Sequence, residues 1–235
     1  MKVQIHIFDT IKYSFLIFYK HLLKTFFAWS ICFILSFVSS LLWFIPGILS
    51  LTKSNLFTGW SSIFLSIWFL LSLCFSIILI FGLWAGFLRF CLKLHDFGTS
   101  SLKLLFKNFK IIQLLRLIGA NILIILLVFG GIILFVIPGL YIAARLILVN
   151  YLIIDKNMRI INAMKNSIRL TKNNVLVLLM ITSIYLLINQ IIFGLFNFIS
   201  VDYSVKGLLF LFIKIYNPLS FFAFAKIYRQ LSWRI

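Results

Sequence analysis

The sequence predicts an all-α protein, a polytopic transmembrane helical bundle of about six spans with amphipathic interfacial helices on the cytoplasmic side. Three observations predict this class. Hydrophobic residues make up 63% of the 235 residues and charged residues only 11%, whereas soluble domains have roughly 25% charged residues. The apolar runs between charges are long enough to cross a bilayer, which takes about 20 residues of helix. The 22 lysines and arginines cluster between those runs and outnumber the four acids, so the net charge is +18.

Charged residues mark the ends of the apolar runs within a single membrane domain, residues 1–235. Four runs contain no charge between their flanking ions. Two further runs each contain one cation, Arg145 in the first and Lys214 in the second. The predicted spans are about 25–48, 62–88, 115–137, 139–155, 174–199 and 205–228.

Amphipathic segments precede three of these spans. Between Asp155 and Asn173, polar residues recur at spacings of three and four, and apolar residues from Ile160 to Val175 form the opposite face. A helix with cations on its polar face lies in the headgroup layer of a membrane. The predicted interfacial helices are about 5–22, 99–112 and 157–171.

The pair Pro138-Gly139 interrupts an apolar segment that runs from residue 117 to residue 155. Proline fits poorly inside a helix, and glycine accepts the left-handed backbone that ends one. With a turn at this pair, 18 cations fall on one side of the membrane and only Lys53 and Lys206 on the other. Without the turn, the cations from Lys156 to Lys172 would cross over, against the rule that cytoplasmic loops carry most Lys and Arg. We therefore expect a turn at the outer surface.

A second pair, Pro46-Gly47, closes the first predicted span in the same way, and we interpret it as another structural turn. Most tryptophans and tyrosines fall near predicted span ends, where amphipathic rings favour the membrane interface. The sequence therefore predicts a multi-pass protein of the plasma or inner membrane, with both termini in the cytoplasm.

The segment from Pro138 to Val175 carries a longer pattern, PGLYIAARLILVNYLIID followed by NAMKNSIRLTKNNV. It resembles a superfamily of six-span bacterial and archaeal membrane proteins. That superfamily includes the DUF975 proteins, the YciC-like UPF0259 proteins and the membrane domain attached to some glycerophosphodiester phosphodiesterases. The pattern departs at Asn162, where the family usually has glutamate, and at Asn173, where it usually has glycine. The resemblance implies a bacterial, α-helical integral membrane protein whose molecular role is mostly undefined.

The two cations inside predicted spans are the candidate binding residues. Arg145 lies about 9 Å beyond the expected turn by helical rise, and Lys214 at a similar depth on the last span. An intramembrane cation costs at least about 2.5 kcal/mol near the bilayer centre, so it usually faces protein or water. Arg145 and Lys214, with Asn150 and Asn217, either line a cavity for an anion or lipid headgroup, or snorkel outward and hydrogen-bond between helices.

The sequence does not predict an enzyme. His95-Asp96 resembles a fragment of a metal or base site, but a metal site needs three or more ligands and the neighbouring residues supply none. Phosphodiester hydrolysis would need clustered carboxylates and histidines, which this composition lacks. Cys32, Cys74 and Cys91 have no metal-ligand spacing and are interpreted as unpaired thiols. We expect no catalytic residue, no metal and no cofactor.

The favoured function is therefore a non-enzymatic membrane protein that organises, supports or senses the membrane or a partner. The alternative is a transporter or channel for a small anionic or lipid substrate, which a water-filled cavity reaching Arg145 and Lys214 would favour. The expected partners are the lipid bilayer and its anionic phospholipid headgroups, not nucleic acid, because the cations lie between apolar runs. A homo-oligomer is compatible with the sequence, which identifies no protein partner.

Overall fold

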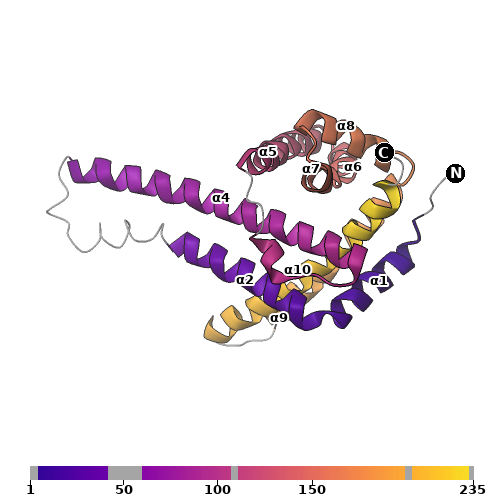
Figure 1. Ribbon diagram of the computed structural model, residues 1–235, viewed down its shortest axis with the longest axis horizontal. Helices are drawn as coiled ribbons and strands as arrows, with labels where there is room; N and C mark the ends of the chain where they lie inside the picture. Colours follow the sequence, from indigo (N-terminus) through magenta and orange to yellow (C-terminus); the bar gives the residue numbers. More distant parts are fainter. Residues whose placement is uncertain (1–4, 42–59, 107–110, 199–202, 233–235) are drawn as a thin grey trace.

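The computed structural model describes residues 5–41, 60–106, 111–198 and 203–232, which are almost entirely helical and contain no strand (Figure 1). The predicted all-α fold class is therefore confirmed. The elements are α1 (Ile7–Lys20), α2 (Leu22–Leu41), α4 (Trp60–Phe97), η1 (Leu102–Leu105), α5 (Ile111–Leu134), α6 (Val136–Leu146), α7 (Val149–Lys156), α8 (Ile160–Thr171), α9 (Val175–Phe198) and α10 (Tyr203–Ser232). In Figure 1, α5 to α8 are grouped above the long helix α4, and α1 and α2 lie below it.

Several of these helices are long and apolar enough to cross a membrane, as expected of a membrane protein. Among the described residues three qualify: Ile67–Phe97 in α4, Ile111–Leu134, and Ile137–Lys156, which joins α6 and α7. A fourth is counted if α8 and the first part of α9, which meet at 99°, form one broken span. The described helices therefore support fewer than the six predicted spans. Predicted spans 25–48, 174–199 and 205–228 overlap α2, α9 and α10, none of which counts as a span by itself among the described residues, and residues 42–48 lie outside those residues.

The chain reverses between α5 and α6 at Phe135, whose backbone is extended (φ −161°, ψ 145°). This is three residues before the Pro138-Gly139 pair that the sequence predicts as the turn. Pro138 is instead the third residue of α6. The N–H groups of a helix's first turn have no acceptor within the helix, so the N–H that proline lacks costs no hydrogen bond at this position. A Cβ on Gly131 would lie 2.8 Å from the Cα of Gly139, so the two helices touch backbone to backbone. The glycines therefore serve close packing next to the turn. The other predicted turn, Pro46-Gly47, lies outside the described residues.

Two of the predicted interfacial helices correspond to helices of the structure. Segment 5–22 corresponds to α1 and segment 157–171 to α8. The described part of 99–112 differs, since it forms only the short 3-10 helix η1 before α5 begins at Ile111. A Cβ on Gly86 would collide with the carbonyl oxygen of Leu105, so the η1 backbone packs directly on α4. That contact holds the segment against the bundle.

Helix α8 packs through its small and hydroxyl residues. Ala163, Ser167 and Thr171 are fully buried, whereas Ile161 and Ile168 of the predicted apolar stripe stay exposed. Exposed isoleucines beside exposed cations suit a helix at a membrane surface, where the apolar side chains enter the bilayer.

The core lies where the C-terminal halves of α4 and α10 meet α7. Its largest fully buried side chains include Phe87 and Phe90 of α4, Leu152 of α7, and Phe222 and Tyr228 of α10. Much of α4 from Ile67 onward and much of α5 expose large apolar side chains, among them Leu70, Leu71, Ile125, Leu126 and Ile133. In water this exposed area would be unfavourable by roughly 25 cal/mol for each Å², so a lipid environment is the solvent that fits these surfaces.

Candidate functional site

The last turns of α4, α7 and α10 meet in a charged junction made by Asp96, Asp155, Tyr228 and Arg229. Arg229 Nη1 donates to Asp155 Oδ2 over 2.8 Å, and Nη2 donates to Asp96 Oδ2 over 2.5 Å. Tyr228 also donates its hydroxyl to Asp155 Oδ2 over 2.8 Å. One arginine therefore binds two of the four acids in the chain and joins three helix ends.

Electrostatics explain why this arginine is needed. Asp96 and Asp155 each lie in the last turn of a helix, where the negative end of the helix dipole disfavours a carboxylate. Burial by itself lowers the pKa of Arg229, but its hydrogen bonds to Asp96 and Asp155 outweigh that effect and raise the pKa above its ordinary value. The guanidinium therefore stays charged and offsets both carboxylates.

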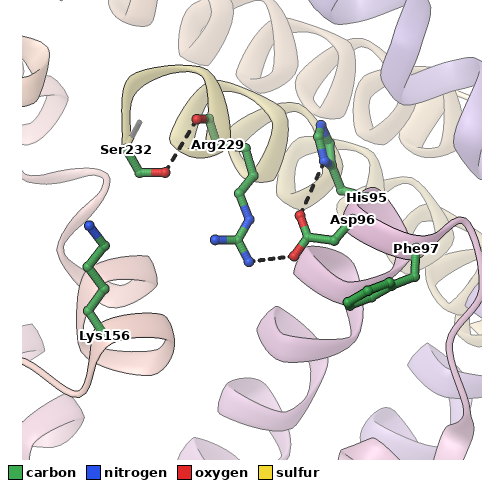
Figure 2. Close-up of a pocket in the computed structure, with 6 residues that line it drawn as sticks. All are labelled: His95, Asp96, Phe97, Lys156, Arg229 and Ser232. Atoms are coloured by element: carbon green, nitrogen blue, oxygen red, sulfur yellow. Dashed lines mark hydrogen bonds and ion pairs between the residues drawn. The ribbon is translucent and has the colours of Figure 1, made fainter. Parts of the chain in front are cut away.

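A cavity of about 630 Å³ lies beside the charged junction (Figure 2). Its walls are His95, Asp96, Phe97, Lys156, Arg229 and Ser232. The Ser232 hydroxyl donates to the carbonyl of Arg229 in its own helix over 3.3 Å, and His95 Nδ1 lies 3.6 Å from Asp96 Oδ1. The serine is thus bonded to backbone and not to a base, which suits electrostatic binding better than nucleophilic chemistry. Among the described residues, no three His, Cys, Asp or Glu side chains gather as a metal site.

A second set of polar contacts lies at the end of α7. Buried Gln113 of α5 donates to the carbonyls of Ile153 (2.9 Å) and Ile154 (3.1 Å), and it accepts a hydrogen bond from Arg89 of α4. These carbonyls belong to the last turn of α7, which lacks donors of its own. Gln113 therefore caps α7 and joins it to α4 and α5.

Arg116 of α5 completes the cap by donating to both the backbone and side-chain oxygens of Asn157, over 2.9 and 3.1 Å. Asn157 ends α7 in the left-handed conformation (φ 51°), which asparagine tolerates better than most residues.

Helix α1 packs on α10 beside the charged junction. Lys226 of α10 donates to the Asp9 carbonyl over 2.9 Å and lies 4.5 Å from the ring centroid of Tyr13. The Tyr13 ring in turn lies 5.3 Å from that of His95. Burial first, and then the Asp96 carboxylate, raise the pKa of Tyr13 to about 12. The N-terminal amphipathic helix is therefore docked on the end of the bundle.

Arg145, the first of the candidate binding residues, makes a helix-to-helix contact. Its Nη1 donates to the Ile168 carbonyl of α8 over 2.8 Å, and its guanidinium lies 5.1 Å from the Tyr141 ring. Its own carbonyl accepts hydrogen bonds from Ser167 (2.6 Å) and Thr171 (3.4 Å). These contacts join the end of α6 to α8.

Asn150, the second candidate, pairs with Asn121 of α5. Each side-chain nitrogen donates to the other side-chain oxygen, over 3.2 and 3.3 Å. Both residues line a second cavity of about 370 Å³, whose lining residues do not include Arg145. Lys214 and Asn217 belong to α10, but their side chains lie outside the described residues. The structure therefore does not bring Arg145 and Asn150 to one site.

Sequence reasoning missed Arg229, Gln113 and Asn121. The signal for Arg229 was the scarcity of acids, since each carboxylate in so basic a chain is expected to find a cation. The signal for Gln113 and Asn121 was an amide side chain inside or beside an apolar run, where it must find a partner. No protein-family model, curated protein or solved structure matches this chain.

Proposed function

We propose that this chain is a non-enzymatic integral membrane protein that organises or supports the membrane from the cytoplasmic side. The observation that carries the proposal is the charged junction, in which Arg229 unites the ends of three helices while apolar side chains cover much of α4 and α5. A bundle locked at one polar end and lipid-facing elsewhere is suited to holding a fixed position in a bilayer.

Exposed lysines and arginines on α4, η1, α7 and α8 support a contact between the protein and anionic lipid headgroups. Lys93, Lys103 and Lys156 are exposed, and so are Lys165 and Arg169 of α8. Such clusters bind anionic lipids at the cytoplasmic surface and follow the positive-inside rule. The resemblance of residues 138–175 to six-span bacterial membrane proteins supports the same proposal, with a bacterial plasma membrane as the location and both termini cytoplasmic.

Cysteine labelling tests the orientation. In a background with the native cysteines replaced, Asn162→Cys on α8 should resist a membrane-impermeant maleimide added to whole cells. The matched variant Ile137→Cys, at an 80% exposed position beside the outer turn, should react. Labelling of Asn162→Cys from outside would overturn the proposed orientation.

Lipid dependence tests the role of the α8 cations. Phosphatidylglycerol added to phosphatidylcholine nanodiscs should raise the thermal unfolding temperature of the native chain. Replacing Lys165, Arg169 and Lys172 by glutamine should reduce that increase, whereas Lys165→Arg, Arg169→Lys and Lys172→Arg should preserve it. An equal increase in all three proteins would contradict the headgroup contact.

A transporter or channel is the second candidate, and the cavity at Asn150 favours it. None of the lining residues that the structure describes is charged, so the cavity suits a neutral lipid better than the small anion that the sequence allows. Flux of a neutral lipid across proteoliposomes containing the protein, absent from protein-free vesicles, would favour this candidate over the first.

A further inference from the structure

The second cavity is partly enclosed by five helices. Its walls come from α4, α5, the α6–α7 segment and α10, and its apolar lining includes Trp84, Leu88, Ile124, Leu146, Ile147, Phe221 and Phe224. Several of these side chains are only half-buried, so the space is reachable from the bilayer. Its volume of about 370 Å³ lies toward the small end of ligand pockets, about 300–1,000 Å³. That size suits one apolar chain better than a two-chain lipid.

The polar groups of this cavity are not fully used by the protein. Asn121 Nδ2 donates to the Leu117 carbonyl (2.8 Å) and to Asn150 Oδ1 (3.2 Å), which uses both of its hydrogens. Asn150 Nδ2 donates to Asn121 Oδ1 over 3.3 Å, which uses one. An amide has two donor hydrogens and two acceptor lone pairs. Within the described structure, Asn150 therefore keeps one N–H and one oxygen lone pair without a protein partner.

The depth of the Asn121–Asn150 pair in the membrane determines where a hydrogen-bond partner for Asn150 can come from. Asn121 is the eleventh residue of the 24-residue helix α5, about 15 Å from its first residue by helical rise. This places Asn121 near the middle of Ile111–Leu134, a helix long and apolar enough to cross the membrane, where the hydrocarbon offers no hydrogen bonds. A molecule that dissolves in the bilayer must therefore bring the missing partner.

Charge restricts that molecule further. Among the described residues that line this cavity none is ionised, and Arg145 already donates to the Ile168 carbonyl. The Tyr151 hydroxyl is also occupied, since it donates to the Phe221 carbonyl over 3.0 Å. A charged headgroup would lie here without a counter-ion, at high cost in free energy. The ligand that fits is neutral.

We propose that this cavity binds a single-chain lipid alcohol, with its hydroxyl on the Asn121–Asn150 amide pair and its chain along the apolar walls. A hydroxyl group accepts the spare N–H of Asn150 and donates to the spare lone pair, whereas an ester or ketone does only the first. Straight-chain and isoprenoid alcohols share this chemistry. The proposal requires the chain to be a membrane protein but does not depend on its orientation or on headgroup binding.

Photo-crosslinking of the purified full-length protein with a diazirine-bearing hexadecanol tests this site. Labelling should map by mass spectrometry to residues of the cavity. Unlabelled 1-hexadecanol should compete at least tenfold better than hexadecane, which lacks the hydroxyl, or hexadecyl phosphate, which adds charge. A farnesol arm distinguishes the straight-chain from the isoprenoid source. Equal competition by hexadecane, or stronger competition by hexadecyl phosphate, would overturn the proposal.

Variants distinguish binding of the hydroxyl by the amide pair from hydrophobic binding by the apolar walls alone. Asn121→Leu combined with Asn150→Leu removes both amides together, and it should abolish the preference for hexadecanol over hexadecane. Thr182→Val, on α9 and outside the cavity lining, should keep the full preference. If the double variant does not fold, Ala143→Phe fills the cavity while leaving the amides in place, and it should abolish labelling. A preference or labelling that survives these changes would refute the proposal.

Discussion

Arg229 and Asp155 join the last turn of α10 to the last turn of α7, with Nη1 2.8 Å from Oδ2 and Nη2 3.2 Å from Oδ1. The two hydrogen bonds match the fork of a guanidinium to both oxygens of one carboxylate, which is the strongest geometry for such a pair. Both side chains are 23% exposed, so water weakens the pair less than it would at an open surface.

Removing Arg229 should destabilise the bundle. Arg229→Ala leaves Asp96 and Asp155 without their cation, and we expect a loss of about 2–3 kcal/mol in unfolding free energy. Arg229→Lys should recover only part of the loss, because an ammonium cannot bind both carboxylates in a planar fork. Unfolding in mixed detergent micelles measures the change. Lys12→Ala, at an exposed position of α1, is the control, expected within about 0.5 kcal/mol of the native chain.

Alkaline pH should weaken the docking of α1 through Tyr13. The folded-state pKa of about 12 lies above the ordinary value of 10.0. The stability from the neutral hydroxyl is therefore present in full below pH 10 and is lost as pH rises toward 12, since the unfolded chain ionises first. Tyr13→Phe should lose less stability across this range. If native and Tyr13→Phe proteins show the same decline in unfolding temperature, the buried hydroxyl has no such role.

Gln113→Leu should lower the unfolding free energy although the two side chains are similar in size. The change leaves Arg89 and the carbonyls of Ile153 and Ile154 without this partner near the core, so we expect a loss of about 2–3 kcal/mol. Gln190→Leu, at an exposed position of α9, is the matched control and should have little effect. Thermal unfolding of both variants in one detergent compares them directly, and equal stability would show that the α7 cap is dispensable.

Replacing the adjacent glycines Gly130 and Gly131 of α5 by alanine should change the stability of the protein in opposite directions. A Cβ on Gly131 would meet the Gly139 backbone at 2.8 Å, so Gly131→Ala must push α5 and α6 apart, at a cost of about 1–3 kcal/mol. A Cβ on Gly130 would meet no atom of the described residues within 4 Å, so Gly130→Ala should be neutral or stabilising by up to about 1 kcal/mol. Thermal unfolding of the two variants in the same detergent measures the difference. Destabilisation by both, or by neither, would contradict the close helix crossing.

Patterns among consecutive residues account for the features of the fold that the sequence predicts. Composition and run length indicate a helical membrane protein because every backbone group in a bilayer must bond within its own helix. The spacing of apolar and polar residues indicates α1 and α8 because amphipathicity is a property of consecutive residues. The reversal near residue 138 follows from charge asymmetry, but its position at Phe135 depends on the Gly131–Gly139 contact, which no local pattern reveals.

The sequence by itself therefore determined the apolar character of this protein, its helical class and the two amphipathic helices α1 and α8, since each depends on neighbours along the chain. Only the tertiary structure decided the partners of its polar side chains. Arg229 meets Asp96 and Asp155 across 133 and 74 residues, and Asn150 meets Asn121 across 29. In an apolar interior each polar group must be satisfied, but which distant group satisfies it depends on how the helices pack.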